Sequence, residues 1–340
     1  MLKQVRRPVL ISALVLALCT ACTITNTRSL VDSAGSEQIL DRAYRQFQPG
    51  QYLQALEGYK VAAAAASTEG NDENFVIALA QTAHVHVLAG HAEPGREWLI
   101  RAQEAATESD EEAWATFLLA RGVYERHDQM IEIARQTFKT MYYFAMENEL
   151  YAQAWQAAHM GTLVNTGEAQ IAWGRRGLDA AEAENNPIWI AHQWSSVASI
   201  FEDQGKFELA LRAFEAARSL TQSHGDFSSK LKSDWEVGHA LRLVGRNADA
   251  TLWMQGVLKR AEEKYMLSRA ESDAYWLGLA QQEMGELAAA AGRQSRAVGW
   301  LRHARKYFVE AGISDKTPDT MAQLDRRIHE LNAGAKREER

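Results

Sequence analysis

The segment that decides the fold runs from Trp194 to Ala217 and reads WSSVASIFEDQGKFELALRAFEAA. On both sides of Gly205, apolar residues recur at intervals of three and four, which is the spacing of one helix face. The glycine interrupts the pattern, so the segment predicts two helices joined by a short turn. Ala198 and Ala210 lie twelve residues apart across that turn and allow the two backbones to approach closely. We therefore predict a helical hairpin here.

The hairpin pattern recurs along the chain. Turn markers equivalent to Gly205 stand at Gly50, Gly90, Gln129, Gly167, Gly205, Gly245 and Gly292. Five positions after each marker comes a small residue, at Ala55, Gly95, Ala134, Ala172, Ala210, Ala250 and Ala297. Four positions later a bulky residue follows in six of the repeats, at Tyr59, Leu99, Phe138, Phe214, Met254 and Leu301. The fourth repeat has Arg176 there, and a shifted register that uses Ile171, Trp173 and Leu178 is the alternative for it.

This order of aromatic and small residues resembles the tetratricopeptide repeat (TPR) family, whose repeats are helical hairpins. The spacing between successive turn markers exceeds the usual TPR period of about 34 residues. The resemblance is therefore to the long-helix subclass. It covers roughly residues 36–312 and implies an all-α fold, namely a right-handed α-solenoid of about seven TPR-like hairpins. The interval between the last two markers, Gly245 and Gly292, is the longest. It predicts a long first helix for the last repeat, from about Arg269 to Ala291.

Residues 313–340 are predicted to form a capping helix with a charged tail. Thr317 and Pro318 have the pattern of a helix start. From there the apolar positions of the helix are Met321, Leu324, Ile328 and Leu331. A solenoid needs such a cap, because no further repeat covers its last apolar face.

Residues 1–21 have the form of an export signal. Three cations, Lys3, Arg6 and Arg7, precede the apolar run 9–18, which is too short for a permanent membrane span of about 20 residues. The stretch LCTAC at 18–22 resembles the bacterial lipobox, which implies a lipid on Cys22. The alternatives are cleavage before Cys19, which would place Leu18 in the position of the small residue, and a plain signal peptide with Cys22 an ordinary residue.

Residues 22–35 are rich in Thr, Ser and Asn and predict a flexible tether between the lipid and the solenoid. Thr23 follows Cys22 where an inner-membrane retention signal has aspartate. We therefore expect a lipid-anchored protein of the outer membrane that faces the periplasm.

Composition agrees with an exported, packed helical protein. Both cysteines, Cys19 and Cys22, lie in the export segment, so no disulfide is expected after it. The chain is 46% hydrophobic with five prolines. Its net charge of −7 becomes −10 when the three cations of residues 1–21 are removed. Such an acidic surface argues against nucleic acid as a partner.

The sequence offers no enzymatic motif. His84 and His86 are two residues apart on a predicted helix and point in different directions, so with His91 nearby they do not predict a metal site. A catalytic Ser motif, a glycine-rich phosphate loop and a cysteine nucleophile in the mature chain are all missing from the sequence. We expect a protein without enzymatic activity, cofactor or metal.

In TPR proteins the first helices of successive repeats line the concave face, and the resemblance therefore implies a partner-binding groove there. The groove residues it implies are Tyr44, Phe47, His84, Val87, Val123, Arg126, His192, Ser195, Ser199, Glu202, Lys232, Trp235, His239, Arg242, Gln282 and Glu286.

Within that set, the sixth repeat has the most distinctive chemistry. Lys232, Trp235, His239 and Arg242 lie at one-face spacing and predict a basic stripe with an aromatic anchor. Such a stripe suits an acidic or C-terminal segment of a partner. The competing interpretation places Trp235 in the core and the charges on a solvated face.

Two classes of function follow from the fold and the predicted location. The first is a lipid-anchored periplasmic scaffold or assembly factor that binds a protein partner of an envelope machine, of the pilus, secretin or polysaccharide-export type. The second is an adaptor or regulator of a periplasmic protease or peptidoglycan hydrolase. The sequence identifies neither the partner nor the oligomeric state.

Overall fold

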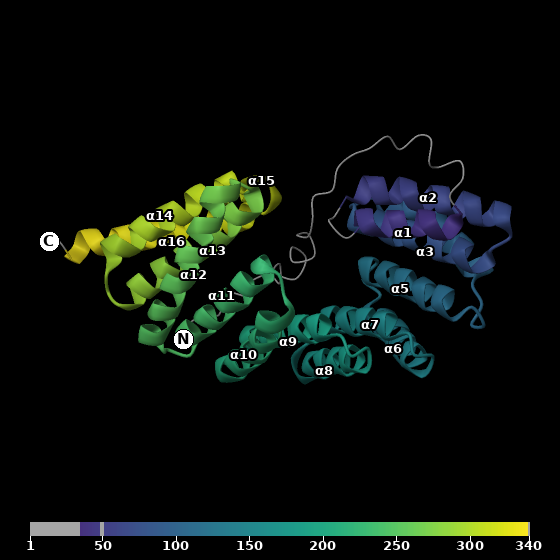
Figure 1. The fold of residues 1–340 in the computed structure, drawn as a ribbon, viewed down its shortest axis with the longest axis horizontal. Helices are drawn as coiled ribbons and strands as arrows, with labels where there is room; N and C mark the ends of the chain where they lie inside the picture. Colours follow the sequence, from purple (N-terminus) through teal and green to yellow (C-terminus); the bar gives the residue numbers. More distant parts are fainter. Residues whose placement is uncertain (1–34, 48–50, 339–340) are drawn as a thin grey trace. The chain divides into compact units, whose positions relative to one another are not determined.

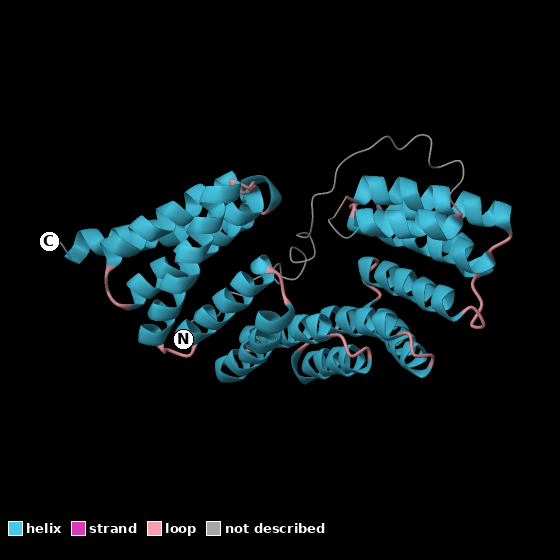
Figure 2. Ribbon diagram, in the orientation of Figure 1, coloured by secondary structure: helices cyan, strands magenta, loops and turns pink. Residues whose placement is uncertain are grey.

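A computed structural model describes residues 35–47 and 51–338, with the side chains of 315, 316 and 335–338 excepted. Within these ranges every regular element is a helix (Figure 2). The predictions that concern the export signal, Cys22, the tether and Gly50 lie outside the described residues. The helices divide into two compact units, one ending at Asn185 and one beginning at Asn186.

The first unit consists of four hairpins (Figure 1). Within each hairpin the two helices pack against each other, and the first helices also contact their neighbours, α1 with α3, α3 with α5 and α5 with α7. The helices are α1 Ser36–Phe47, α2 Tyr52–Glu69, α3 Asp72–Leu88, α4 Ala92–Ala105, α5 Glu111–His127, α6 Ile131–Glu147, α7 Tyr151–Val164 and α8 Gly167–Ala183.

The second unit consists of three hairpins and a C-terminal cap. Its helices are α9 Pro187–Asp203, α10 Phe207–His224, α11 Phe227–Leu243, α12 Asn247–Ser268, α13 Glu271–Ala290, α14 Gln294–Glu310, α15 Ile313–Lys316 and α16 Pro318–Glu338. With the first unit this makes seven hairpins, so the predicted all-α solenoid of TPR-like hairpins is confirmed. The predicted long first helix corresponds to α13.

The turns explain why the markers recur. Gly90, Gly205, Gly245 and Gly292 all have positive φ, a left-handed conformation that glycine adopts without steric cost. Gln129, which replaces glycine in the third repeat, takes the same conformation with φ of 62°. Side-chain caps from Asn71, Asn186 and Asp226 accept backbone N–H bonds at the starts of α3, α9 and α11.

Small residues allow the helices of each hairpin to meet. Ala55, Ala134, Ala210, Ala250 and Ala297 are all fully buried, as predicted. The first helices contribute small residues as well: Ala198 was expected from the sequence, and glycines do the same in other hairpins. A Cβ on Gly122 would lie 2.4 Å from the ring of Phe138, and one on Gly238 would lie 2.6 Å from Met254. The bulky residues Phe138 and Met254 of the second helices therefore pack on glycines of their partner helices.

The fourth repeat uses the shifted register. Ala172, predicted as a close-contact position, is exposed, and Ile171, Trp173 and Leu178 are buried instead. Trp173 packs on α7, where a Cβ on Gly161 would lie 2.3 Å from the indole. The marker Gly167 has positive φ but is already the first residue of α8. The residue five positions after it, Ala172, therefore lies on the exposed face of α8 and not on the face that packs on α7.

The cap begins at Pro318 as predicted. Met321, Leu324 and Leu331 of α16 are buried with Phe308 and Leu301 of α14, and Ile328 is partly buried beside them. This contact covers the last repeat of the second unit. None of the described helices combines the length and the apolarity that a bilayer crossing requires.

Candidate partner-binding site

The first helices of the second unit carry a row of linked polar side chains. Two carboxylates, Glu236 of α11 and Glu283 of α13, stand nine residues before the turn glycines Gly245 and Gly292. Because they occupy the same position in successive repeats, each faces the first helix of the preceding repeat. Both side chains are buried and both are paired with residues of that helix.

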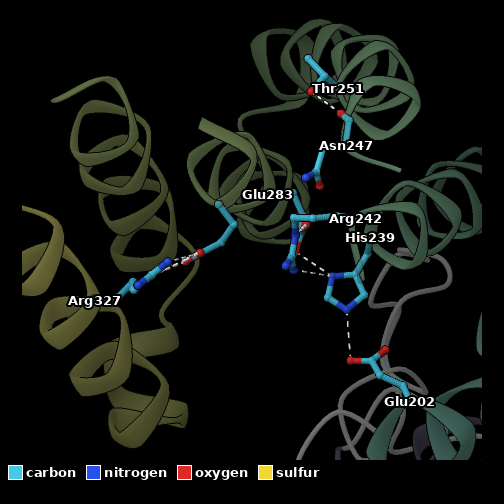
Figure 3. A network of polar contacts seen from close by, with 8 residues as sticks. Glu202, His239, Arg242, Asn247, Thr251, Glu283 and Arg327 are labelled. Atoms are coloured by element: carbon cyan, nitrogen blue, oxygen red, sulfur yellow. Dashed lines mark hydrogen bonds and ion pairs between the residues drawn. The ribbon is translucent and has the colours of Figure 1, made fainter. Parts of the chain in front are cut away.

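His239 is the centre of the row (Figure 3). Its Nδ1 lies 2.7 Å from Oε1 of Glu283, and its Nε2 lies 3.1 Å from Oε1 of Glu202 on α9. The imidazole therefore bridges three successive first helices. Burial, which leaves His239 8% exposed, would lower its pKa, but the charge of Glu283 and the hydrogen bonds with both carboxylates outweigh burial and raise the pKa to about 9. The ring is thus positively charged at neutral pH.

Arg242 completes the pairing of Glu283. Its Nε donates to Oε2 at 2.6 Å and its Nη2 donates to Oε1 at 3.1 Å, which is a two-pronged contact. Burial would raise the pKa of Glu283, which is 3% exposed, but the cations of His239 and Arg242 lower it to about 2. A buried carboxylate held by two cations is a fixed part of the fold.

Pairing continues on both sides of this centre. Lys232 forms an ion pair with Glu236, which also accepts a 3.0 Å hydrogen bond from Oγ of Ser195 on α9. Glu286 of α13 accepts a hydrogen bond from Nη2 of Arg327 on the cap helix at 2.8 Å. Figure 3 labels Arg327. The row therefore runs from α9 to α16.

These contacts correct the predicted basic stripe. Lys232, His239 and Arg242 do share one face of α11, but a neighbouring carboxylate neutralises each of them. The stripe is not an excess of positive charge. Trp235 stacks on the His239 ring with centroids 5.0 Å apart and is only half-buried, which excludes it from the interior of the core.

Two indoles on this side of the second unit have an unused donor. Nε1 of Trp235 on α11 and Nε1 of Trp276 on α13 are both shielded from solvent and have no hydrogen-bond acceptor among the described residues. His192, Ser199 and Gln282, also predicted for the groove, are half-buried on α9 and α13. Ser199 donates its hydroxyl to the carbonyl oxygen of Ser195 in its own helix.

The first unit brings the other predicted residues onto α1, α3 and α5. Tyr44 is exposed, and Phe47 lies with its ring centroid 6.0 Å from that of His84. Arg126 is half-buried near the end of α5. Val123 corrects the prediction, because it is 1% exposed and belongs to the apolar core.

Arg126 lies near two histidines of neighbouring first helices. Burial and the Arg126 charge together lower the pKa of His84 on α3 to about 4, and the same two causes lower the pKa of His159 on α7. Both rings are therefore neutral at pH 7. In the part of the chain that the structure describes, no three metal-ligating side chains come together.

The architecture is shared with solved structures at low sequence identity. The apo form of RapI superposes with a TM-score of 0.63 at 13% identity, over 88% of this chain and 86% of RapI. A Rap protein in complex with competence and sporulation factor gives 0.50 at 13% identity, over 87% and 88%. A signal-transduction ATPase of Pyrococcus horikoshii with a tetratricopeptide repeat sensor gives 0.51 at 11% identity, over 92% of this chain and 55% of that protein.

The chain has a TPR fold. No protein-family model matches the sequence, and no curated protein matches it. The TPR fold is a helical repeat scaffold suited to protein–protein interaction, and its first helices carry the predicted groove residues of both units.

Sequence reasoning missed the residues that neutralise the predicted cations. Glu236 and Glu283 share a position nine residues before a turn glycine, and that recurrence is a signal which the repeat spacing contains. Arg327 gave no comparable signal, because it lies on the cap helix α16, outside the hairpins whose spacing carries the recurrence.

Proposed function

We propose that this protein is a lipid-anchored periplasmic scaffold that holds a protein partner of an envelope machine on the first-helix faces of its TPR fold. The export signal and lipobox-like stretch ending at Cys22 support the location. The fold supports the mode of action, because hairpin repeats present long surfaces to other proteins. Pilus, secretin and polysaccharide-export assemblies are the envelope machines we favour, and the proposed role is non-enzymatic.

One observation carries the binding role. The first helices of both units hold polar atoms that are shielded from water and have no acceptor or donor among the described residues, namely Nδ1 of His84, Nε of Arg126, and Nε1 of Trp235 and Trp276. A buried polar group without a partner costs free energy. The four side chains that carry these atoms are half-buried and border the surface. A bound segment that shifts them slightly can supply backbone carbonyls and side chains to these atoms, which makes these faces the favoured docking surface.

Site-specific photo-crosslinking in living cells tests the proposal. In the first unit, a photoreactive residue replaces Tyr44 on α1, which is 46% exposed, or Leu53 on α2, which is 68% exposed. In the second unit, Gln282 on α13 and Leu252 on α12 form the equivalent pair. Each pair compares a first helix with a second helix of the same unit.

We expect one protein to crosslink to the Tyr44 and Gln282 positions and not to Leu53 or Leu252. Mass spectrometry of the adduct identifies it. Crosslinks from the second-helix positions alone place the docking surface elsewhere and contradict the proposal, as does an adduct that contains only cytoplasmic proteins.

A further inference from the structure

Two arginines occupy the same place in their repeats but have different surroundings. Arg126 is the penultimate residue of α5, and Arg242 is the penultimate residue of α11; both helices have 17 residues. Each arginine lies three residues before a turn residue with positive φ, Gln129 or Gly245. In the second unit, Arg242 donates two hydrogen bonds to Glu283 of α13, the next first helix.

Among the described residues, Arg126 has no equivalent partner. Its Nε is shielded from solvent and has no acceptor among the described residues. The next first helix, α7, reads YAQAWQAAHMGTLV and contains no acid. On α3, the preceding one, the acids Asp72 and Glu73 lie in the first turn, at the opposite end from His84. The nearest acids in sequence are already paired, Glu125 with Arg121 and Thr137, and Asp128 with Arg96.

Neutral and aromatic groups surround this cation. His84 and His159 come from the two flanking first helices, α3 and α7, each of which contacts α5. Phe47 lies against His84, and Trp155 stacks on His159 with centroids 6.4 Å apart. The Nδ1 of His84 is a second polar atom without a partner among the described residues. A guanidinium whose Nε has no acceptor among the described residues is thus flanked on both sides by neutral histidines and aromatic rings.

We propose that Arg126 is the anchor of a carboxylate-binding site in the first unit, and that its ligand is a glutamate side chain in an extended segment of the protein partner, flanked by an apolar residue. The site rests on the proposed function, because the ligand belongs to the partner. Glu283 in the second unit is the internal template: it shows the two-pronged contact that an arginine at this position makes with a glutamate.

Arginine side-chain NMR of the purified full-length chain tests this site. The probes are N-acetyl-Phe-Ala-Glu-amide, its Gln counterpart, and N-acetyl-Phe-Ala-Ala with a free C-terminal carboxylate. The observed signals are the Nε–Hε resonances of Arg126 and Arg242, assigned from Arg126→Gln and Arg242→Gln. Arg242 is the matched control, because its fork already binds Glu283.

We expect the Glu peptide to shift the Arg126 resonance at millimolar concentration and to leave Arg242 unmoved. The Gln peptide and the free-acid peptide are expected to bind at least tenfold more weakly. The Arg126→Gln variant is expected to lose Glu-peptide binding, and Arg126→Lys to weaken it, since lysine lacks the fork. Circular dichroism confirms that each variant is folded.

The site is overturned if the Glu and Gln peptides bind equally, if both arginine signals move together, or if Arg126 does not move at all. Stronger binding of the free-acid peptide overturns the side-chain source of the carboxylate. The partner found by crosslinking separates the two proposals. A partner that crosslinks to wild type and to Arg126→Gln equally leaves the proposed function standing and refutes the carboxylate site, whereas no crosslinked partner in wild type refutes the proposed function itself.

Discussion

Single residues decide how closely the helices of a hairpin approach. In the third, sixth and seventh repeats, a glycine of the first helix lies sixteen residues before the bulky residue that packs on it: Gly122 before Phe138, Gly238 before Met254, and Gly285 before Leu301. A methyl group has no space at these positions. Gly256 of α12 differs from these glycines, because a Cβ there would meet nothing within 4 Å.

This contrast gives a stability prediction. Gly122→Ala forces Phe138 or the helix backbone to move, and we expect it to destabilise the fold by about 1–3 kcal/mol, as overpacking of a core does. The matched variant Gly256→Ala replaces a helical glycine in open space and is expected to stabilise by up to about 1 kcal/mol. Denaturant unfolding of both variants measures the difference. Equal effects of the two substitutions would contradict the close contact.

His239 gives a pH prediction. At pH values below its ordinary pKa of 6.5 the imidazole is charged in both the folded and the unfolded chain, so its pairing with Glu283 and Glu202 stabilises in full. As the pH rises from about 6.5 to about 9, the unfolded chain loses this proton while the folded chain keeps it, and the stabilisation falls. The loss is at most about 3 kcal/mol for this pKa difference.

The measurement is the unfolding free energy of wild type and His239→Gln between pH 6 and pH 9.5. We expect the advantage of wild type to be largest at the acidic end and to shrink toward the alkaline end. A gap that stays constant over this range would mean that the charge of His239 contributes nothing to stability.

Among the helices, the cap helix α16 covers the last hairpin of the second unit. Its apolar side chains cover Phe308 and Leu301 of α14, and two ion pairs hold it in place, Arg305 with Asp325 and Arg327 with Glu286. Without α16 the apolar face of the last hairpin is open to water. Large exposed apolar surfaces favour association.

A truncation tests this role. Removing residues 313–340 is expected to produce self-associated protein in analytical ultracentrifugation at micromolar concentration, with a lowered melting temperature. The control is removal of residues 332–340, which keeps Met321, Leu324 and Leu331 in place. If the longer truncation is as monomeric as the control, then α16 does not cap the solenoid.

The helical hairpins could largely be predicted from the sequence, but the ion pairs between their helices could not. Alternating small and bulky residues around glycine turns identify hairpins because close packing has a local, repeating requirement, as Ala210 and Phe214 show. In the fourth repeat the register counted from Gly167 was wrong, because Gly167 is already the first residue of α8. The close contact between the two helices is made by Gly161 and Trp173. Charge pairing joins residues some 40 positions apart, such as Arg242 and Glu283, so the spacing within one repeat does not reveal it.

For the whole molecule, the repeat units and the N-terminal segment have separate roles in the proposed function. The first described helix begins at Ser36, and the proposed lipid site, Cys22, precedes it in the sequence. Attachment and folding are therefore expected to be independent properties of the chain.

Cys22→Ser tests that independence. We expect the variant to move from the membrane pellet to the soluble periplasmic fraction, because a serine accepts no thioether-linked lipid. Its melting temperature is expected to equal that of the wild-type chain without its lipid. A variant that still sediments with outer membranes after a high-salt wash would show that something other than a lipid on Cys22 holds the protein there.

The contrast between Arg242, which is ion-paired with Glu283, and Arg126, whose Nε has no acceptor among the described residues, has a consequence for ionic strength. Attraction between charges of two molecules is screened over about 8 Å in physiological salt. Recognition by the second unit then depends on shape and apolar contact and persists when salt is added. If Arg126 binds a partner carboxylate as proposed, recognition by the first unit weakens with added salt, and in the proposed periplasmic location the ionic strength would tune how firmly the first unit holds the partner.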